Sequence, residues 1–461
     1  MGTVLTGATI CTASGAFRAD LRLEGETVDS VGFGLARPGD AVVDLPDRLL
    51  LPGAVDVHTH FDLPLTTTST ADDFASGTAA ALLGGTTTVV DYATAFRGQS
   101  AAEGIEAWHG RADGRAFCDY AFHLALTDWK GSLAEELPSV IDGGISSFKL
   151  YMAYKGSLQV DDGALYAAAR RIGELGGLLC VHCENGDLVA ARAEELVASG
   201  VTGPAGHPLS RPASVEAEAV GRMIAIADLA RCPLYVVHVS AERSMREIVM
   251  ARRRGQPLFA ETCPQYLLLD EGRYGREGLK AAAFVLAPPL RSAADGRALW
   301  GRLARGEIDT VATDHCSFTL AQKAVGLDDF RLIPNGLPGV EHRLVLLYSE
   351  GVAKGRLSLE RFVDSCCTAP ARLFGLRGKG SLEPGSDGDV VVFDPRVEWV
   401  LSASNQHHRT DYTPYEGLAV KGRVESVFLR GRRLVDGGTL LDGTPRGRYR
   451  RRQPFSKGVR P

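Results

Sequence analysis

Short apolar runs alternate with helix-like stretches through the middle of the chain, from about residue 51 to residue 376. Eight runs occur in this order: AVDVHTH, TTTVVDYA, CDYAFHLAL, ISSFKLYMAY, GLLCVHCEN, PLYVVHVSA, QPLFAETCP and DTVATDHC. Between them lie stretches with helical spacing of apolar residues, such as ADDFASGTAAALLG and EAEAVGRMIAIADLA. Alternating strands and helices predict a parallel sheet, and eight such units predict an α/β protein with a (β/α)8 TIM-type barrel. An open, doubly wound sheet is the alternative, but no G-x-G-x-x-G follows the first run.

Both ends of the chain have a different pattern, with short strand-like runs and turns. Residues 1–50 contain TVLTGATICT and ADLRLEGETVDSVG, and the other end contains DVVVFDP and VKGRVESVFLRGRRLV. This texture predicts one small β-sandwich domain built from both chain termini. We therefore expect residues 1–50 and 377–461, the latter with a tail, to form this domain. Residues 51–376 are expected to form the barrel, with an insertion of unassigned structure at residues 265–291.

Composition excludes some classes of protein. The chain has 461 residues, of which 45% are hydrophobic, which is enough for two cores. Its net charge of -5 gives no reason to expect a nucleic-acid or membrane-surface partner. The basic run RGRYRRR, at residues 446–452, is interpreted as a solvated or subunit-contacting tail.

Targeting signals and cysteines indicate a cytoplasmic protein. No apolar run has membrane-spanning length, and the first residues lack a signal-peptide pattern. The nine cysteines have no disulfide-like spacing, which favours a reducing compartment. Cys180 and Cys183 are interpreted as small core residues, because on a strand they point to opposite faces.

Chemically active side chains stand near the C-terminal ends of the apolar runs, where barrel enzymes build their active sites. The first run carries two histidines on one face, and the fourth, fifth, sixth and eighth runs carry one polar residue each. These residues are His58, His60, Lys149, His182, His238 and Asp314. Each alone has an ordinary structural explanation, but all six face one pocket if the barrel closes. We therefore predict a single site that contains them.

Imidazole and carboxylate groups suit Zn²⁺, and also Mn²⁺ or Co²⁺. Six ligands are too many for one tetrahedral zinc but fit two divalent metal ions with a shared ligand. Lys149 cannot be that ligand as an ammonium, which has no lone pair. Burial beside cations would lower its pKa, and the free amine could add CO₂ to give a carbamate that bridges two ions. The alternative is a lysine that extends from the strand end to solvent.

Seven motifs occur in order along the chain: GAVDVHTHFDLP, FKLYMAYKG, VHCEN, VVHVSA, ATDHCSF, IPNGLPGVEHR and DYTPYEG. Together they resemble the amidohydrolase superfamily and, within it, the dihydropyrimidinase and D-hydantoinase family, over nearly the whole length. The resemblance implies that His58, His60 and Asp314 bind the more buried metal and that His182 and His238 bind the more exposed one. It also implies that Lys149, as a carbamate, bridges both metals, and that the protein is a homo-oligomer, a tetramer or a dimer.

The implied reaction opens the ring of a small cyclic ureide or imide. The ring belongs to a 5-substituted hydantoin or a dihydropyrimidine, and the product is an N-carbamoyl amino acid. A hydroxide held between the two metals attacks the ring carbonyl. Asp314 takes its proton and delivers it to the leaving ring nitrogen, and the hydroxyl of Tyr154 stabilises the oxyanion.

The resemblance also implies substrate contacts. Asn335, in IPNG, would hold the ring through its main chain, and Ala287 stands where the family usually has serine. If the serine hydroxyl matters, the ring preference shifts. Leu65 and Phe96 are expected in loops that line the pocket, together with Leu63 and Met152. This apolar set favours a bulky or aromatic substituent, with ordinary loop packing as the alternative.

Three other functions remain open from the sequence. Dihydroorotases and allantoinases share much of the metal site, but dihydroorotases usually place an arginine directly after the H-x-H, where this chain has Phe61 and Asp62. An orphan cyclic-imide hydrolase would use the same chemistry on another ring. A non-catalytic dihydropyrimidinase-like scaffold is the third, although such relatives have lost metal ligands and all six are present here.

Overall fold

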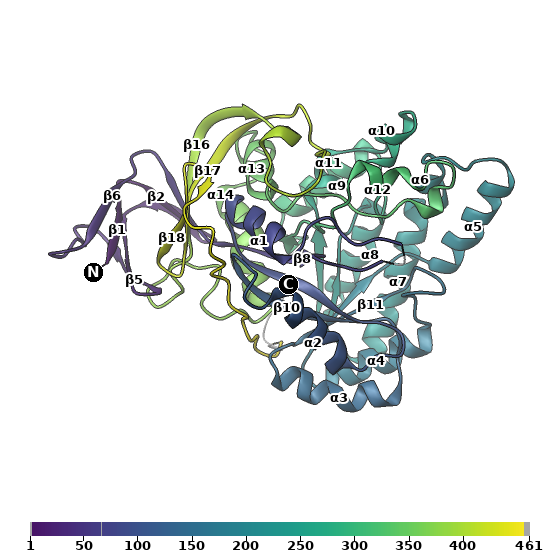
Figure 1. The fold of residues 1–461 in the computed structure, drawn as a ribbon. Helices are drawn as coiled ribbons and strands as arrows, with labels where there is room; N and C mark the ends of the chain where they lie inside the picture. The colour runs from purple at the N-terminus through teal and green to yellow at the C-terminus, as the bar shows by residue number, and fades with distance from the viewer. Residues whose placement is uncertain (1, 66, 456–461) are drawn as a thin grey trace.

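The computed structural model describes residues 2–65 and 67–455, and it contains a barrel beside a smaller pair of β-sheets (Figure 1). Eight parallel strands form one sheet in chain order. They are β8 (Ala54–Thr59), β9 (Thr86–Ala95), β10 (Asp119–Leu126), β11 (Ser147–Tyr151), β12 (Leu178–His182), β13 (Leu234–Val236), β14 (Leu258–Thr262) and β15 (Thr310–Val311). A parallel bridge between Thr59 and His315 joins the first strand to the segment after the last. The predicted barrel is therefore confirmed, and each of the eight apolar runs contains one strand.

Helices surround the barrel and follow most of its strands. The longer ones are α1 (Phe74–Leu83), α2 (Ala101–Ala112), α3 (Gly131–Asp142), α4 (Asp162–Glu174), α5 (Gly186–Ala198), α7 (Ala213–Ala230), α8 (Glu242–Arg253) and α11 (Ala293–Ala304). Local sequence fixes several starts: Ser100 and Glu103 form a capping box at α2, and Asp161 caps α4.

Shorter helical segments fill the connections. They are α6 (Gly206–Ser210), α9 (Pro264–Leu268), η1 (Glu271–Gly275), α10 (Leu279–Ala282), α12 (Leu320–Ala324), η2 (Phe330–Leu332), α13 (Arg343–Leu347), η3 (Tyr348–Val352), α14 (Leu359–Val363), η4 (Asp364–Thr368), α15 (Ala369–Leu373) and η5 (Ala403–Asn405). The insertion at residues 265–291 thus consists of three short helical turns joined by irregular backbone.

The two smaller sheets combine both ends of the chain. One contains β5 (Thr27–Gly32), β4 (Asp20–Glu24), β1 (Thr3–Thr6) and β6 (Ala41–Asp44) in that order. The other contains β19 (Thr439–Leu440), β18 (Arg432–Asp436), β17 (Ala419–Leu429), β16 (Val390–Val400), β7 (Leu49–Pro52), β2 (Thr9–Thr12) and β3 (Gly15–Arg18). The pairing of β7 with β16 joins the termini, as predicted. The domain limits themselves stay a prediction, and residues 456–461 of the last range lie outside the described residues.

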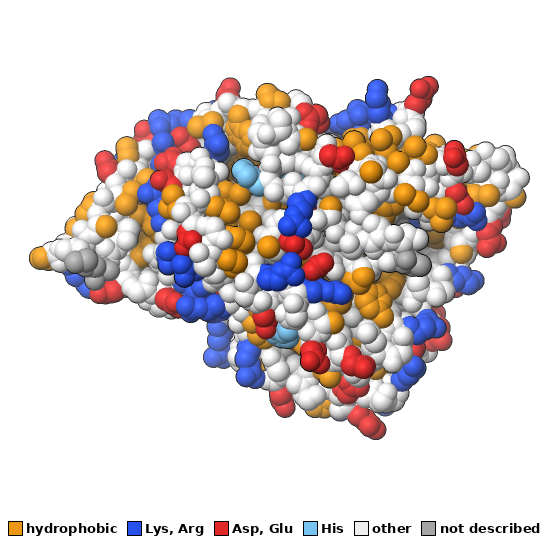
Figure 2. Space-filling view, viewed as in Figure 1, with side chains coloured by type: hydrophobic (Ala, Val, Ile, Leu, Met, Phe, Trp, Pro, Cys, Tyr) orange, Lys and Arg blue, Asp and Glu red, His pale blue; other side chains and the backbone are white. Residues whose placement is uncertain are grey.

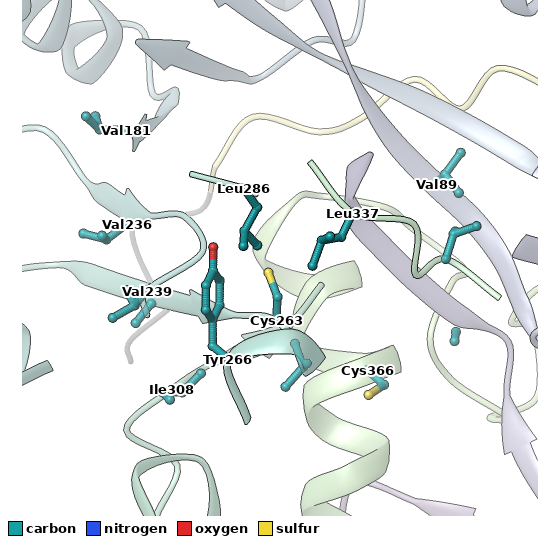
Figure 3. Packing of buried hydrophobic residues seen from close by; sticks show 14 of the residues in the cluster. Val89, Val181, Val236, Val239, Cys263, Tyr266, Leu286, Ile308, Leu337 and Cys366 are labelled. Atoms are coloured by element: carbon teal, nitrogen blue, oxygen red, sulfur yellow. The ribbon is translucent and has the colours of Figure 1, made fainter. Parts of the chain in front are cut away.

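Strand alternation divides the core into an inner and an outer layer. Neighbours Cys180 and Val181 belong to different buried clusters: Cys180 packs inside the barrel, and Val181 packs in the layer beneath the helices. Figure 3 shows part of that outer layer, with Val181 and Val236 beside Val239. Cys183 is also buried, so both cysteines are core residues as predicted. All nine cysteines are free and buried.

The C-terminal tail covers the amino-terminal end of the barrel. The amide of Arg452 donates to Gly144 O at 2.9 Å, and the amide of Phe455 donates to Gly176 O at 2.9 Å. The guanidinium of Arg452, which is 2% exposed, donates to the carbonyls of Phe122 and Phe374. The prediction of a solvated or subunit-contacting tail is therefore wrong for Arg452, because contacts distant in sequence bury this side chain.

The surface carries charges of both signs. On the face in Figure 2, lysine and arginine alternate with aspartate and glutamate, and hydrophobic side chains gather near α6, α10 and α12. Within the described residues, no helix is both long and apolar enough to cross a membrane.

Candidate active site

The six predicted ligands lie at the carboxyl-terminal end of the barrel. Their positions are the end of β8 for His58 and His60, β11 for Lys149, the last residue of β12 for His182, and the turns after β13 and β15 for His238 and Asp314. Parallel strands direct their carboxyl ends to one rim, so residues from five strands meet there. Their roles as ligands stay a prediction, but the structure brings the side chains together.

Asp314 lies at the centre of one group. Its Oδ1 is 3.1 Å from His58 Nε2 and 3.3 Å from His60 Nε2. Burial by itself would raise the pKa of Asp314, but His58, His60 and His238 lower it well below the ordinary value. Burial also lowers the pKa of His58 and His60, so these imidazoles are neutral and can offer lone pairs.

His182 and His238 form the second group. His182 Nδ1 is 3.0 Å from His238 Nε2, and burial lowers the pKa of both rings. The buried Nδ1 of His238 has no hydrogen-bond partner among the described residues. Potential ligand atoms of His58, His238 and Asp314 lie within 4.8 Å of one another, so the two groups adjoin. Two facing imidazole nitrogens beside a carboxylate form a donor set that suits a divalent cation.

Lys149 lies between these groups without a counter-ion. Its Nζ is 3.0 Å from His58 Nε2 and 4.1 Å from the centre of the Tyr92 ring, and the residue is 1% exposed. It forms no ion pair with a carboxylate in the part of the chain that the structure describes. Burial lowers the pKa of its amine. An unpaired buried ammonium is costly, so this environment favours an uncharged amine or a modified one.

Three residues of the site have strained backbone. Tyr154, His238 and Asp314 have φ values of 70°, 39° and 52°, a region that side chains other than glycine rarely adopt. Each lies two or three residues after the end of a strand. Strained backbone persists only where surrounding contacts enforce it, and it often marks functional sites.

Glu261 on β14 is a site residue that the sequence analysis missed. Its carboxylate accepts hydrogen bonds from the amide of His238 at 2.9 Å and from the hydroxyl of Tyr235 at 2.9 Å, and it lies 2.6 Å from His58 Nδ1. Burial raises the pKa of Glu261 to about 8. It thereby orients one histidine and fixes the turn of another. A glutamate inside the apolar run QPLFAETCP was the available signal.

Glu184 and Arg211 were also missed as a pair. Glu184 Oε2 lies 3.0 Å from His182 Nε2 and 2.5 Å from Arg211 Nη1. Arg211 in turn lies 5.6 Å from the centre of the Tyr154 ring. Glu184 stands in the recognised VHCEN motif, but only the fold reveals Arg211 as its partner.

Tyr154 lies beside the second histidine group, with its ring 5.1 Å from that of His182. Burial raises the pKa of its hydroxyl above the ordinary value, and Arg211 lowers it by less. The phenol is therefore protonated at neutral pH and can donate a hydrogen bond.

The four residues predicted to contact the substrate differ in their exposure and in their contacts. The buried Oδ1 of Asn335 has no hydrogen-bond partner among the described residues, and Ala287 is 8% exposed. Leu65 is 39% exposed, whereas Phe96 packs against Trp108 with ring centres 6.4 Å apart. Asn335 thus has an acceptor free for a ligand, while the contact of Phe96 is consistent with ordinary packing. All four roles stay predictions.

Three comparisons relate the chain to known proteins. The profile of the Amidohydrolase family matches residues 49–434. D-hydantoinase of Geobacillus stearothermophilus is 42% identical over 99% of this chain and 97% of its own length. D-phenylhydantoinase of Escherichia coli is 41% identical over 99% of both chains. The crystal structure of dihydropyrimidinase from Brevibacillus agri superposes with a TM-score of 0.98 at 42% identity, covering 99% of this chain and all (100%) of that one.

Proposed function

Because the chain belongs to the amidohydrolase family, we propose that it is a cyclic amide hydrolase that opens 5-substituted hydantoins and dihydropyrimidines to N-carbamoyl amino acids. The convergence of four histidines, Lys149 and Asp314 at one barrel rim carries the proposal. The names of the relatives, D-hydantoinase, D-phenylhydantoinase and dihydropyrimidinase, support this substrate class. They also favour the D-enantiomer and an aromatic substituent.

The residues present fit two divalent cations, Zn²⁺ first and Mn²⁺ or Co²⁺ as alternatives. His58, His60 and Asp314 would hold one ion, and His182 and His238 the other. The facing nitrogens His182 Nδ1 and His238 Nε2, 3.0 Å apart, and the neutral imidazoles support this fit. Such ions, when bound, supply positive charge that acidifies a water molecule and polarises the ring carbonyl.

Lys149 would join the two ions as a carbamate. Its neutral amine attacks the carbon of CO₂, an N–C bond forms, and one proton is lost to solvent. The product is an anion with two oxygens in place of a cation. This change means that the side chain no longer has to be buried as an uncompensated ammonium, and it adds the negative charge that two cations require.

The residues around the substrate ring would transfer the proton, stabilise the oxyanion and hold the ring. Water adds its oxygen to the ring carbonyl carbon, the ring C–N bond breaks, and the nitrogen gains a proton. Asp314 Oδ moves that proton, because its lowered pKa leaves it an unprotonated acceptor. The Tyr154 hydroxyl donates to the developing oxyanion. Asn335 and Ala287 would hold the ring through their main chains, and the buried side-chain Oδ1 of Asn335 is a further acceptor without a partner among the described residues.

The alternative functions named from the sequence would each give a different result in the substrate and metal tests. A preference for allantoin or dihydroorotate would place the chain with allantoinases or dihydroorotases, and activity on a different cyclic imide would make it an orphan hydrolase. A scaffold without catalysis would bind less than one metal ion per chain after reconstitution. We also propose a homo-oligomer, either a tetramer or a dimer. The cytoplasmic location stays a prediction.

The test is a panel of rings on protein reconstituted with Zn²⁺, Mn²⁺ or Co²⁺. Hydantoin, each enantiomer of 5-phenylhydantoin, dihydrouracil, allantoin and dihydroorotate are followed by ring-opening absorbance. We expect D-5-phenylhydantoin to have the highest kcat/KM. No turnover of any ring by protein that holds two ions per chain contradicts the proposal.

A further inference from the structure

Lys323, on the short helix α12, is completely buried, with an exposed fraction of 0%. Its ammonium donates three hydrogen bonds to backbone carbonyls: to Val285 O at 2.6 Å, to Pro334 O at 2.7 Å and to Gly336 O at 2.8 Å. A lysine ammonium has three N–H donors and no acceptor. The three carbonyls therefore use its full donor capacity.

No carboxylate neutralises this charge within the described residues. Burial lowers the pKa of Lys323 to about 7, and the neighbour that opposes this shift is the Cys316 thiol. Burying an ammonium without a carboxylate is costly, so a lysine used only to fill space would be a poor choice. Converging carbonyl dipoles, and the Phe318 ring with its centre 5.5 Å from Nζ, are the favourable features of this position among the described residues.

The three carbonyls belong to two segments far apart in sequence. Val285 lies two residues before Ala287, and Pro334 and Gly336 flank Asn335. The amide of Gly336 also donates to Val285 O at 3.1 Å, so the two segments touch. Figure 3 shows Leu286 and Leu337, from the same two segments, in one buried cluster with Tyr266. Both proposed ring contacts therefore depend on one junction.

We propose that Lys323 is a positioning residue whose ammonium fixes the spacing of the two backbone segments that hold the substrate ring, and thereby sets substrate affinity. This inference rests on the proposed function. Lys323 touches neither the metal ligands nor the ring, and it acts through Ala287 and Asn335. Loss of the ammonium leaves the buried carbonyls of Pro334 and Gly336 without this donor and Val285 O with the Gly336 amide, so the segments loosen and the ring is held in the wrong place.

Lys379 provides a matched control. It is 5% exposed, and its ammonium forms ion pairs with Asp119, Asp387 and Asp389 at 2.7 to 2.9 Å, at the other end of the barrel. Methionine retains most of the lysine side-chain volume and removes the ammonium. Lys323→Met and Lys379→Met therefore make the same chemical change at two buried sites, only one of which adjoins the pocket.

The experiment compares both variants with the unaltered protein in three measurements: metal content, steady-state kinetics on D-5-phenylhydantoin, and hydrogen exchange of peptides covering residues 284–290 and 333–338. For Lys323→Met we expect two bound ions per chain and faster hydrogen exchange in both peptides. We also expect kcat/KM to fall by about 10²-fold, with the rise in KM larger than the fall in kcat. For Lys379→Met we expect unchanged KM and unchanged exchange in these peptides. If Lys323→Met does not fold, Lys323→Gln, which keeps two donors, is measured in the same way.

Two results would overturn the inference. One is an unchanged KM in a folded Lys323 variant that has lost only thermal stability. The other is unchanged exchange in both peptides. Exchange does not depend on turnover, so loosened segments in a protein that opens no ring would contradict the proposed function and leave the positioning role intact.

Discussion

Three buried lysines have different partners at the two ends of the barrel. At the carboxyl end, Lys149 and Lys323 have no carboxylate partner among the described residues. At the amino end, the ammonium of Lys379 has three aspartates around it. A buried ammonium surrounded by carboxylates is compensated, whereas one without them is costly and is retained only where it has another use. The contrast supports a structural role for Lys379 and functional roles for Lys149 and Lys323.

Removing Lys149 should give the largest effect. Lys149→Ala is expected to abolish ring opening and to lower the metal content. This loss of activity is larger than the roughly 10²-fold loss expected when a residue that only orients a metal ligand is removed. Acetate or propionate should restore part of the activity, because a carboxylate can replace the carbamate. Metal analysis and ring-opening absorbance measure both effects.

The matched control is Lys155→Ala, because Lys155, in the turn after β11, is an exposed lysine that pairs with Asp187 of α5 at 2.8 Å. It should retain metal and activity. Full activity in Lys149→Ala would contradict the bridging role.

Removing Lys379 tests the opposite end. Lys379→Met should lower the free energy of unfolding by about 3–5 kcal/mol, because it removes the ammonium shared by three aspartates and leaves the buried Asp389 without an ion-pair partner among the described residues. Burial raises the pKa of Asp119, but Lys379 and Arg430 lower it further, to below the ordinary value. The stabilisation is therefore present above the ordinary carboxyl pKa and is lost as the pH falls through the lowered one.

Urea unfolding checks this prediction at neutral pH and below about pH 4. The difference in unfolding free energy between Lys379→Met and the unaltered protein should shrink at the lower pH. An equal difference at both pH values would mean that the lysine contributes by packing alone.

Removing one hydroxyl separates catalysis from metal binding. Tyr154→Phe should keep both ions and lower kcat by about 10²–10³-fold, the usual effect of losing one oxyanion donor. Tyr449→Phe, in the tail at the amino end, is the control and should leave kcat unchanged. Loss of metal in Tyr154→Phe would instead show that this tyrosine supports the site structurally.

The smallest effect is expected at the surface of the tail. Arg448 donates to both carboxylate oxygens of Glu26, at 2.7 and 2.8 Å, and this interaction lowers the pKa of Glu26. Because both side chains are exposed, Arg448→Ala should cost less than about 1 kcal/mol of unfolding free energy. The cost should disappear in high salt, and also as the pH falls through the lowered pKa of Glu26. A cost that persists in high salt would point to packing.

Much of the fold could be predicted from local patterns. Eight apolar runs predicted eight strands, because each run is a buried segment of parallel sheet bounded by helical spacing. The ligand candidates could be found for the same reason: residues such as His182 stand where a strand ends, and all parallel strands end at one rim. The prediction for the tail was wrong at Arg452. RGRYRRR has the composition of a solvated segment, and the carbonyl partners of Arg452 are found only at the amino-terminal end of the folded barrel.

The sequence by itself determined the strand count, the place of the site and the residue types available for it. The tertiary structure decided which residues serve one another: Glu261 meets His58 across 203 positions, and Arg452 meets Phe122 across 330. It also decided that Lys323 joins two segments instead of facing solvent. The physical reason is that alternation and helical spacing are properties of neighbouring residues, whereas hydrogen-bond and charge partners are fixed only when the barrel closes.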